Sequence, residues 1–585
     1  MRIHNSLVRE QLLGLYKGIF SDLATFSSSK EISRDLQTFE NRLKNEGITF
    51  CTSTLPSLGK AIYRSFETGS LNCPSNFRRT KGTTLPAFLR GLFSKVYEPT
   101  GELKVQPCYR SLKAIVQVCF LVYKLELPYK RKLREKVIQN FVEVESELKD
   151  LFIDSTDHIL DDARNIMTSI FKGFNPQNIE PRHGPGAVAT GERFGEKWNF
   201  KTLYRNIHEV YPYWEYFLPS YRTAFTSGEW YRNLNILDSG CAKVHLVNKD
   251  SRGPRLISME PLEYQFIQQG LGRSIVRWLE RHQVTRGLVN FTKQSVNQKL
   301  TYCKSYATLD MKEASDRVSL KLVKELFRDL PDLLEALCAT RTDSTLLPDR
   351  TKISLEKFAP MGSALCFPIE SAVFFCLSEA VRKHWRIKGY TFVMGDDIVV
   401  PRKLAQYLFE TFPRFGLKFN EDKCFIHGRF RESCGFDMFD DEFITPIRMR
   451  KCLPRSRKDA TGLVSAVSLR NYLYQGGFYK AAEFLEGMIM RLYPSGIATG
   501  GRLDLPCLTF LTRSSRIDLS RNRGVRWNKD LQRREYRMLC YVEKTKRNDV
   551  SPIGKLFSNL LCQRQVTAPV PHAGTIKLRW MPEMA

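Results

Sequence analysis

The chain has 585 residues, and its 90 Lys and Arg outnumber its 62 Asp and Glu, which gives a formal net charge of +28. A hydrophobic content of 42% is enough to fill large cores and excludes global disorder. The longest apolar run, Ala114 to Tyr123, is shorter than the roughly 20 residues of a membrane-spanning helix, so no membrane is expected as a partner. The positive charge favours nucleic acid as a partner. The alternative is that the charge only keeps the protein soluble, by repulsion between molecules.

The first third of the chain is predicted to be mostly helical. Within residues 1–175, the stretch Lys130 to Phe152 mixes charged and apolar residues at helical spacing. Residues 181–200 contain four glycines and are predicted to form a packed loop. From about residue 235 to residue 450, short β-prone runs alternate with helical patterns. These patterns predict an α+β fold.

A basic stretch lies between two apolar runs at Val244 to Pro261. Lys249, Arg252 and Arg255 form its polar centre. Such cations can clamp a triphosphate and neutralise charge that develops on pyrophosphate. A basic surface turn is the alternative interpretation.

An acidic residue follows the next short strand. The β-like run Tyr306 to Leu309 ends at Asp310, and apolar residues then recur at helical spacing from Val318 to Leu330. This pattern predicts strand, turn and helix, and it places the Asp310 carboxylate in the crevice beyond the strand.

A second acidic site falls within Gly389 to Pro401, where two β-prone runs flank Gly395, Asp396 and Asp397. The pattern predicts a hairpin, although an ordinary turn would also use Gly and Asp. If the strand before Asp310 pairs with this hairpin, three carboxylates converge and need cations between them. Mg²⁺ prefers such ligands, and two Mg²⁺ ions are the usual catalysts of in-line phosphoryl transfer.

Residues 511–550 carry twelve Lys and Arg against five Asp and Glu, interleaved with Trp527, Tyr536 and Tyr541. Basic residues contact phosphates and aromatic rings stack on bases, so this segment is a candidate nucleic-acid surface. A solvated helical face explains it equally well.

Cysteine and histidine give no sign of a metal site. The fifteen cysteines are scattered without a Cys-x-x-Cys pair, and the nine histidines are dispersed. Unpaired thiols in this number are typical of a reducing, intracellular compartment.

Taken in order, these elements resemble the palm and fingers of a viral RNA-dependent RNA polymerase, most closely the replicase subunits of the leviviruses, which are positive-strand RNA bacteriophages. The resemblance covers residues 180–450. The palm motifs correspond to Asp310–Asp316, Met361–Ser371, Gly395–Asp397 and Asn420 with Lys423, and the basic fingers motif to Lys249, Arg252, Arg255, Glu260 and Pro261. Gly184–Ala187, Gln294, Asn297 and Phe430–Gly435 also resemble phage-replicase segments.

Two residues depart from the family pattern in the second palm motif. Ala364 stands where the family often has glycine, and Pro368 replaces a common carboxylate. The departures put the nucleotide contacts of this loop in doubt but leave the metal ligands untouched.

The resemblance implies a role for each site residue. Asp310, Asp396, Asp397 and the Met311 carbonyl would hold two Mg²⁺ ions, for which Mn²⁺ can substitute. The implied nucleotide-binding residues are Lys249, Arg252, Arg255, Asp316, Gly362, Ser363, Ser371 and Asn420. Asp316 and Ser371 would sense the ribose 2′-hydroxyl, with helix capping and packing as their alternatives. Lys423 would be the general acid for pyrophosphate, or else a solvent-facing lysine.

The resemblance also implies a right-hand architecture, with largely helical N-terminal and C-terminal parts. Its expected divisions are an N-terminal region with fingers at 1–234, the basic fingers motif at 235–305, a palm with an antiparallel sheet at 306–450, and a thumb with a basic end at 451–585. Implied partners are template and product RNA, nucleoside triphosphates, host elongation factors Tu and Ts and a ribosomal protein. The implied activity is primer-independent replication of a phage genome in the host cytoplasm.

Two other classes remain open from the sequence. A reverse transcriptase would share the palm and the metals, but Asp316 and Gly395 favour RNA synthesis. A non-catalytic RNA-binding protein would explain the charge, but not three acidic residues at strand ends. Incorporation assays with ribonucleotides and deoxyribonucleotides separate these classes.

Overall fold

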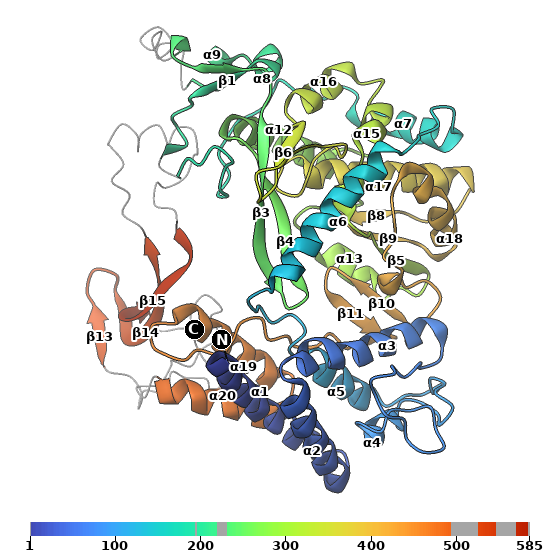
Figure 1. Cartoon of the computed structure of the whole chain (residues 1–585), viewed down its shortest axis with the longest axis vertical. Coiled ribbons are helices and arrows are strands. Elements are labelled where there is room, and N and C mark those ends of the chain that lie inside the picture. The colour runs from blue at the N-terminus through green and yellow to red at the C-terminus, as the bar shows by residue number, and fades with distance from the viewer. Residues whose placement is uncertain (1, 194–195, 219–230, 493–523, 546–568, 583–585) are drawn as a thin grey trace.

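The structure, a computed structural model, describes residues 2–193, 196–218, 231–492, 524–545 and 569–582. It is a mixed helix and sheet fold, as the α+β prediction requires (Figure 1). Within these ranges, no helix is both long and apolar enough to cross a bilayer. Twelve of the cysteines in these ranges, from Cys51 to Cys452, are free thiols.

The N-terminal helices pack against helices from the far end of the chain (Figure 1). Asp22 shows the connection, because its carboxylate accepts hydrogen bonds from the backbone N–H groups of Lys480 (2.8 Å) and Ala481 (3.1 Å) at the start of a C-terminal helix. The elements of this part are α1 (Arg2–Leu23), α2 (Ser29–Glu46), η1 (Phe50–Thr54), α3 (Leu55–Thr68), α4 (Arg90–Phe93), α5 (Tyr109–Phe120), α19 (Ala460–Gln475) and α20 (Tyr479–Leu492).

The central sheet has three antiparallel strands in the order β5-β9-β8. Continuous runs of buried, mostly apolar residues explain these strands, and the polar turn at Gly395 joins two of them, as the sequence predicts. The strands are β5 (Tyr306–Asp310), β8 (Phe392–Met394) and β9 (Asp397–Pro401), and the helices around them are α7 (His158–Phe171), α13 (Ser295–Leu300), α14 (Ala314–Arg317), α15 (Leu320–Leu326), α16 (Pro331–Ala339), α17 (Cys366–His384), α18 (Arg402–Thr411), η3 (Phe412–Phe415) and η4 (Glu421–Lys423).

A four-stranded sheet carries the basic stretch as a long hairpin, in the strand order β4-β3-β6-β7. Helix α6 (Arg131–Lys149), predicted from its spacing, runs diagonally past this hairpin in Figure 1. The strands are β3 (Cys241–Asp250), β4 (Gly253–Met259), β6 (Ser344–Leu346) and β7 (Lys352–Ser354), and the neighbouring elements are β1 (Thr202–Tyr204), α8 (Arg205–Val210), α9 (Tyr213–Tyr216), β2 (Asn235–Leu237) and α12 (Leu262–Arg281).

Two smaller sheets complete the fold. One is β10 (Phe430–Ser433), β11 (Phe436–Phe439) and β12 (Glu442–Phe443), and the other is β13 (Val525–Asn528), β14 (Arg533–Thr545) and β15 (Pro569–Pro582). The second sheet corrects the expectation of a mostly helical C-terminal part. Its Arg and Glu residues, good helix formers, instead pair across strands, as Arg526 does with Glu535 at 2.7 Å.

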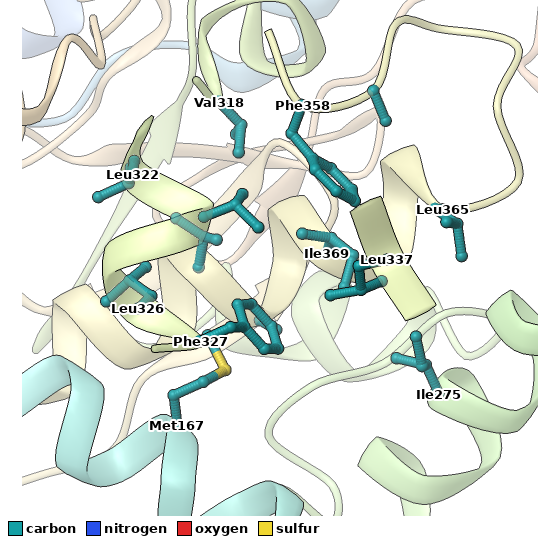
Figure 2. Packing of buried hydrophobic residues seen from close by; sticks show 14 of the residues in the cluster. Met167, Ile275, Val318, Leu322, Leu326, Phe327, Leu337, Phe358, Leu365 and Ile369 are labelled. Carbon is teal, nitrogen blue, oxygen red and sulfur yellow. The ribbon is translucent and has the colours of Figure 1, made fainter. Parts of the chain in front are cut away.

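Two large apolar cores organise the chain, and their limits differ from the sequence divisions. One core joins residues 8–125 with residues 425–489. The other joins residues 159–234 with residues 262–424. Figure 2 shows side chains of this second core, among them Met167 of α7, Ile275 of α12, Leu322 of α15 and Ile369 of α17. The elements on both sides of residue 234 thus share one apolar core that also includes the central sheet.

Glu263 in the first turn of α12 makes folding stability depend on pH. Its side chain is buried, with Oε2 unpartnered, and burial raises its pKa from 4.5 to about 7. The folded chain thus holds this proton more tightly than the unfolded chain. The resulting cost to folding is absent below pH 4.5, grows as the pH rises, and reaches about 3 kcal/mol above pH 7.

We expect Glu263→Gln to gain stability relative to the wild type by about 2 kcal/mol between pH 5 and pH 8. Urea unfolding at the two pH values measures this change. Glu335→Gln, at an exposed position of α16, is the matched control and should show no pH-dependent difference. A constant offset for Glu263→Gln at both pH values would contradict the account.

Candidate active site

The three predicted carboxylates meet at the end of the central sheet. Asp310 ends β5 and lies directly opposite Asp397, the first residue of β9, while Asp396 occupies the connecting turn. Burial, followed by the negative charge of Asp310, raises the pKa of Asp396. Burial, followed by Asp396 and Asp310, raises the pKa of Asp397 to about 6. The strand pairing expected from the sequence is confirmed, and the three carboxylates repel one another.

The turn before Asp396 is tightly constrained. Gly395 has φ +62°, and a Cβ atom at this position would lie 2.1 Å from the ring of Phe367. The buried Ser371 hydroxyl accepts a hydrogen bond from the Gly395 N–H at 3.2 Å and donates one to the Phe367 carbonyl at 2.8 Å. In this structure Ser371 thus positions the turn. Its predicted contact with the nucleotide stays a prediction.

Asp310 is held by the two residues of the fourth palm motif. The Asn420 amide donates to one carboxylate oxygen at 2.7 Å, and the Lys423 ammonium donates to the other at 2.8 Å. Burial lowers the pKa of Lys423, but Asp310 and Glu432 outweigh this effect and raise it above its ordinary value. Lys423 is therefore a counter-ion of Asp310 here, although it was predicted as a general acid or a solvent-facing lysine.

Asp397 is held by the turn of the Phe430–Gly435 segment. Its carboxylate accepts a hydrogen bond from the Cys434 N–H at 3.2 Å, and Cys434 has the left-handed φ of +50°. The backbone carbonyl of Asp397 accepts a hydrogen bond from the Asn297 side chain at 3.4 Å. Two segments that resemble phage replicases thus lie against the same acidic turn.

The Gly184–Ala187 segment lies elsewhere, beside α12. The buried Lys197 ammonium donates to the carbonyls of Gly184 (2.9 Å) and Gly186 (2.5 Å), and to the Gln265 side chain. These contacts hold the loop in place, and none of them involves the three carboxylates.

The basic hairpin contributes cations of two kinds. Lys249 and Arg255 are exposed, whereas Arg252 is bound to the Asp250 carboxylate at 2.6 Å and lies over the Tyr123 ring at 4.9 Å. Partial removal from solvent, followed by Arg255, lowers the pKa of Lys249, and the charge of Lys249 opposes the rise in the pKa of Asp396. Lys249 and Arg255 remain available for a phosphate, while Arg252 fastens the hairpin tip to the N-terminal part.

The second palm motif is fastened to this hairpin. A Cβ atom on Gly362 would lie 2.1 Å from the Ser258 carbonyl of β4, and Ser258 N–H donates to the Met361 carbonyl at 2.8 Å. The Ser363 hydroxyl accepts from the Leu365 N–H at 3.3 Å, just before α17. Their predicted nucleotide contacts stay predictions. These contacts hold the loop directly against the hairpin.

A cavity of about 200 Å³ adjoins Lys423 and Asn420. The cations that line it come largely from outside the motifs and include Lys60, Arg64, Lys124, Arg252 and Arg448. Burial, followed by Arg448 and Arg450, lowers the pKa of Lys124 to about 8. With Lys423 the lining has six cations against the three carboxylates of Asp422, Glu432 and Asp437, and this excess of positive charge favours an anionic occupant. No local sequence pattern predicts this set, because its members lie far apart in the chain.

Two buried residues near the carboxylates, Lys357 and Glu370, have no role predicted from the sequence, although Glu370 lies within the Met361–Ser371 motif. Lys357 donates to the Asp316 carboxylate at 2.7 Å. Glu370 of α17 is buried, and burial, followed by the charge of Asp396, raises its pKa well above 4.5. The sequence could have pointed to Glu370, because it is an acidic residue among the apolar residues of the helix that follows Met361. No comparable sequence feature marks Lys357.

The donor chemistry of the site fits a hard divalent cation. Carboxylates are the ligands such ions prefer, and the raised pKa values of Asp396 and Asp397 show negative charge that a cation would neutralise. Within the described residues, no group of three or more His, Cys, Asp or Glu side chains is placed to hold a metal ion. The Asp310 carboxylate is bound by Lys423 and Asn420 in this structure, so metal binding would require it to exchange those partners.

Known proteins resemble the segment that contains this site. Residues 217–464 match the family model RNA replicase, beta-chain. The chain is 33% identical over 214 residues to the RNA-directed RNA polymerase subunit beta of Enterobacteria phage SP, and 33% identical over 225 residues to that of Qbeta virus (strain MX1). It is 30% identical over 237 residues to the RNA-directed RNA polymerase beta chain of Escherichia phage MS2.

These alignments cover 36%, 37% and 40% of this chain, and 36%, 37% and 42% of the respective relatives. The chain therefore matches little more than a third of the length of the first two. The resemblance to levivirus replicase subunits is confirmed for this central segment.

Solved structures are more distant. The RNA-dependent RNA polymerase of a human picorbirnavirus, as an insertion loop deletion mutant, gives a TM-score of 0.36 at 14% identity, covering 63% of this chain and 77% of that chain. The polymerase of BmCPV at its elongation state gives 0.41 at 11% identity, covering 80% of this chain and 48% of that chain. These values are too low to assign an architecture.

Proposed function

We propose that this protein is an RNA-dependent RNA polymerase that copies a single-stranded phage RNA genome by nucleotidyl transfer. The observation that carries the proposal is the meeting of Asp310, Asp396 and Asp397 at one sheet end, beside a basic hairpin. Carboxylates so placed suit cations that bridge to phosphate, and the hairpin supplies charge for the triphosphate. We propose a right-hand arrangement, in which the β5-β9-β8 sheet is the palm.

Asp310, Asp396, Asp397 and the Met311 carbonyl are the residues that would hold Mg²⁺, or Mn²⁺ in its place. Two such ions would supply activation of the RNA 3′-hydroxyl and neutralisation of the leaving pyrophosphate. The chain positions two of these carboxylates for this task, while Asp310 would first have to exchange its contacts with Lys423 and Asn420. Ser371 fixes the turn of Asp396, and the Cys434 N–H orients Asp397.

The triphosphate binds beside Lys249 and Arg255, which are exposed on the hairpin. Arg252 keeps the hairpin against Tyr123, so its contribution is to hold these cations in place. The cation-lined cavity next to Lys423 accepts the pyrophosphate end. A protonated Lys423, released from Asp310, is the proton donor to that leaving group.

The ribose lies near Asp316, with the Gly362–Ser363 loop and Asn420 at its edges. A site that bonds a hydroxyl rejects the analogue that lacks it, so this arrangement selects ribonucleotides. That selection distinguishes the proposal from a reverse transcriptase.

The printed name "subunit beta" of two relatives describes those proteins as parts of a complex. We propose that this chain is likewise the catalytic part of an assembly in the cytoplasm of a bacterial host, with elongation factors Tu and Ts and a ribosomal protein. Initiation without a primer is part of the same proposal.

Single-nucleotide incorporation on homopolymer RNA templates tests this function. The purified chain, alone and with host extract, should incorporate the ribonucleotide complementary to the template, and should do so only with Mg²⁺ or Mn²⁺. Deoxyribonucleotides should be incorporated far more slowly. RNA binding without incorporation would support the RNA-binding alternative, and a preference for deoxyribonucleotides would support the reverse transcriptase.

A further inference from the structure

Lys357 is a buried cation in the loop between β7 and α17. Its side chain is 0% exposed, and its ammonium lies 2.7 Å from Asp316 Oδ1 and 3.0 Å from Glu145 Oε1. The same ammonium lies 3.7 Å from the centre of the Phe141 ring. A charged group removed from water in this way is held in one position by its partners.

Glu145 of α6 fixes the backbone of this loop as well as the lysine side chain. Its second oxygen accepts hydrogen bonds from the N–H groups of Glu356 at 2.6 Å and Lys357 at 3.3 Å. The position of the Lys357 ammonium is therefore set by a helix more than 200 residues earlier in the chain.

Helix α6 is also fastened to the turn that carries Asp316. Asn140 donates to the Glu313 carboxylate at 2.8 Å, and Arg317 donates to Glu147 at 2.8 Å. The turn itself starts at Glu313 with a left-handed φ of +55°. Helix α6 therefore binds both the loop that carries Lys357 and the turn that carries Asp316.

Asp316 stands between this support and the catalytic carboxylates. Its side chain is 27% exposed, in contrast to the fully enclosed lysine. The negative charges of Asp396 and Asp316 both add to the rise in the pKa of the buried Glu370, which burial mainly causes. One face of Asp316 is therefore bound by Lys357, and the residue remains open to the crevice on another.

We propose that Lys357, set in place by Glu145 and Phe141, is a positioning residue that fixes the Asp316 carboxylate and thereby determines discrimination between ribonucleotides and deoxyribonucleotides. The inference rests on the proposed function and deepens it. Without the ammonium, Glu145 and Asp316 repel each other, and Asp316 turns toward solvent, away from the 2′-hydroxyl.

Lys357→Met tests the inference, because methionine keeps much of the volume and removes the charge. The ratio of kcat/KM for a ribonucleotide to that for its deoxy analogue should fall about tenfold, through slower use of the ribonucleotide. Lys352→Met, at an exposed position of β7 nearby, is the matched control and should leave the ratio unchanged.

A double variant separates positioning from a general loss of structure. If Lys357 acts through Asp316, adding Lys357→Met to Asp316→Asn should change the ratio no further. Equal slowing of both substrates by Lys357→Met, with the ratio intact, would overturn the inference.

If Lys357→Met does not fold, Glu145→Gln decides, because its amide can still accept the backbone hydrogen bonds while the charge facing Lys357 is lost. A lowered ratio supports the inference and a wild-type ratio overturns it. A wild-type chain that incorporates no nucleotide would instead refute the proposed function itself.

Discussion

Asp396→Asn is expected to reduce nucleotide incorporation by about three orders of magnitude or more, while RNA binding stays at the wild-type level. The substitution removes a charge that metal binding and transition-state stabilisation require, and it keeps the shape of the turn. Single-turnover incorporation measures the first effect and filter binding of RNA the second. Asp332→Asn, at an exposed position at the start of α16, is the matched control.

The same variant should be at least as stable as the wild type. Burial and the charge of Asp310 raise the pKa of Asp396, so its ionised form is destabilised in the folded chain. Asparagine removes that repulsion, as is common when a residue is kept for function at a cost to stability. Thermal unfolding at pH 8 checks this. Near-normal incorporation by Asp396→Asn would refute its catalytic assignment.

Gly395→Ala is expected to lower incorporation about 100-fold, because it displaces the turn that carries Asp396. The backbone has φ +62°, and the new Cβ atom would lie 2.1 Å from Phe367 Cε2. A displacement of roughly 1 Å in a catalytic group is enough for such a loss. Incorporation at saturating nucleotide, which reports kcat, measures the effect.

Two further variants separate the causes. Gly287→Ala has a similar φ of +76° and open space around the new Cβ, so it should cost about 1–2 kcal/mol of stability and leave incorporation unchanged. Adding Phe367→Ala to Gly395→Ala removes the clash and should recover part of the activity. If the double variant recovers no activity, the loss caused by Gly395→Ala is due to backbone strain alone.

The central hairpin and the strand before Asp310 could be predicted because their signals are local. Short apolar, β-prone runs and a Gly-Asp turn specify strands and a hairpin within a dozen residues. The register that sets Asp310 opposite Asp397 was conditional on pairing, and the structure confirms it.

Contacts between distant segments could not be predicted in this way. The Glu145–Lys357 pair joins residues more than 200 positions apart, and the carboxylate of Asp22 caps a helix at residue 480. A single sequence does not show which distant residues come into contact, so the core that the two ends of the chain share was not predicted. The C-terminal sheet was missed for another reason, because its many Arg and Glu residues favour helices until cross-strand partners are present.

The basic motif illustrates the same limit within one stretch. Lys249, Arg252 and Arg255 look equivalent in sequence, but Asp250 and Tyr123 bind only Arg252 among them in the described contacts. Segment 511–550 stays a prediction as a nucleic-acid surface, since residues 511–523 and 546–550 lie outside the described ranges.

The most direct test of RNA-templated synthesis at this carboxylate site is the sequence of the product made from one RNA template of mixed sequence. The full chain, with host extract where needed, should yield an RNA strand complementary to the template in the presence of Mg²⁺. The same reaction with Asp396→Asn, or with the metal chelated, should yield none. A wild-type reaction without complementary RNA, or an equal yield from Asp396→Asn, would contradict the account.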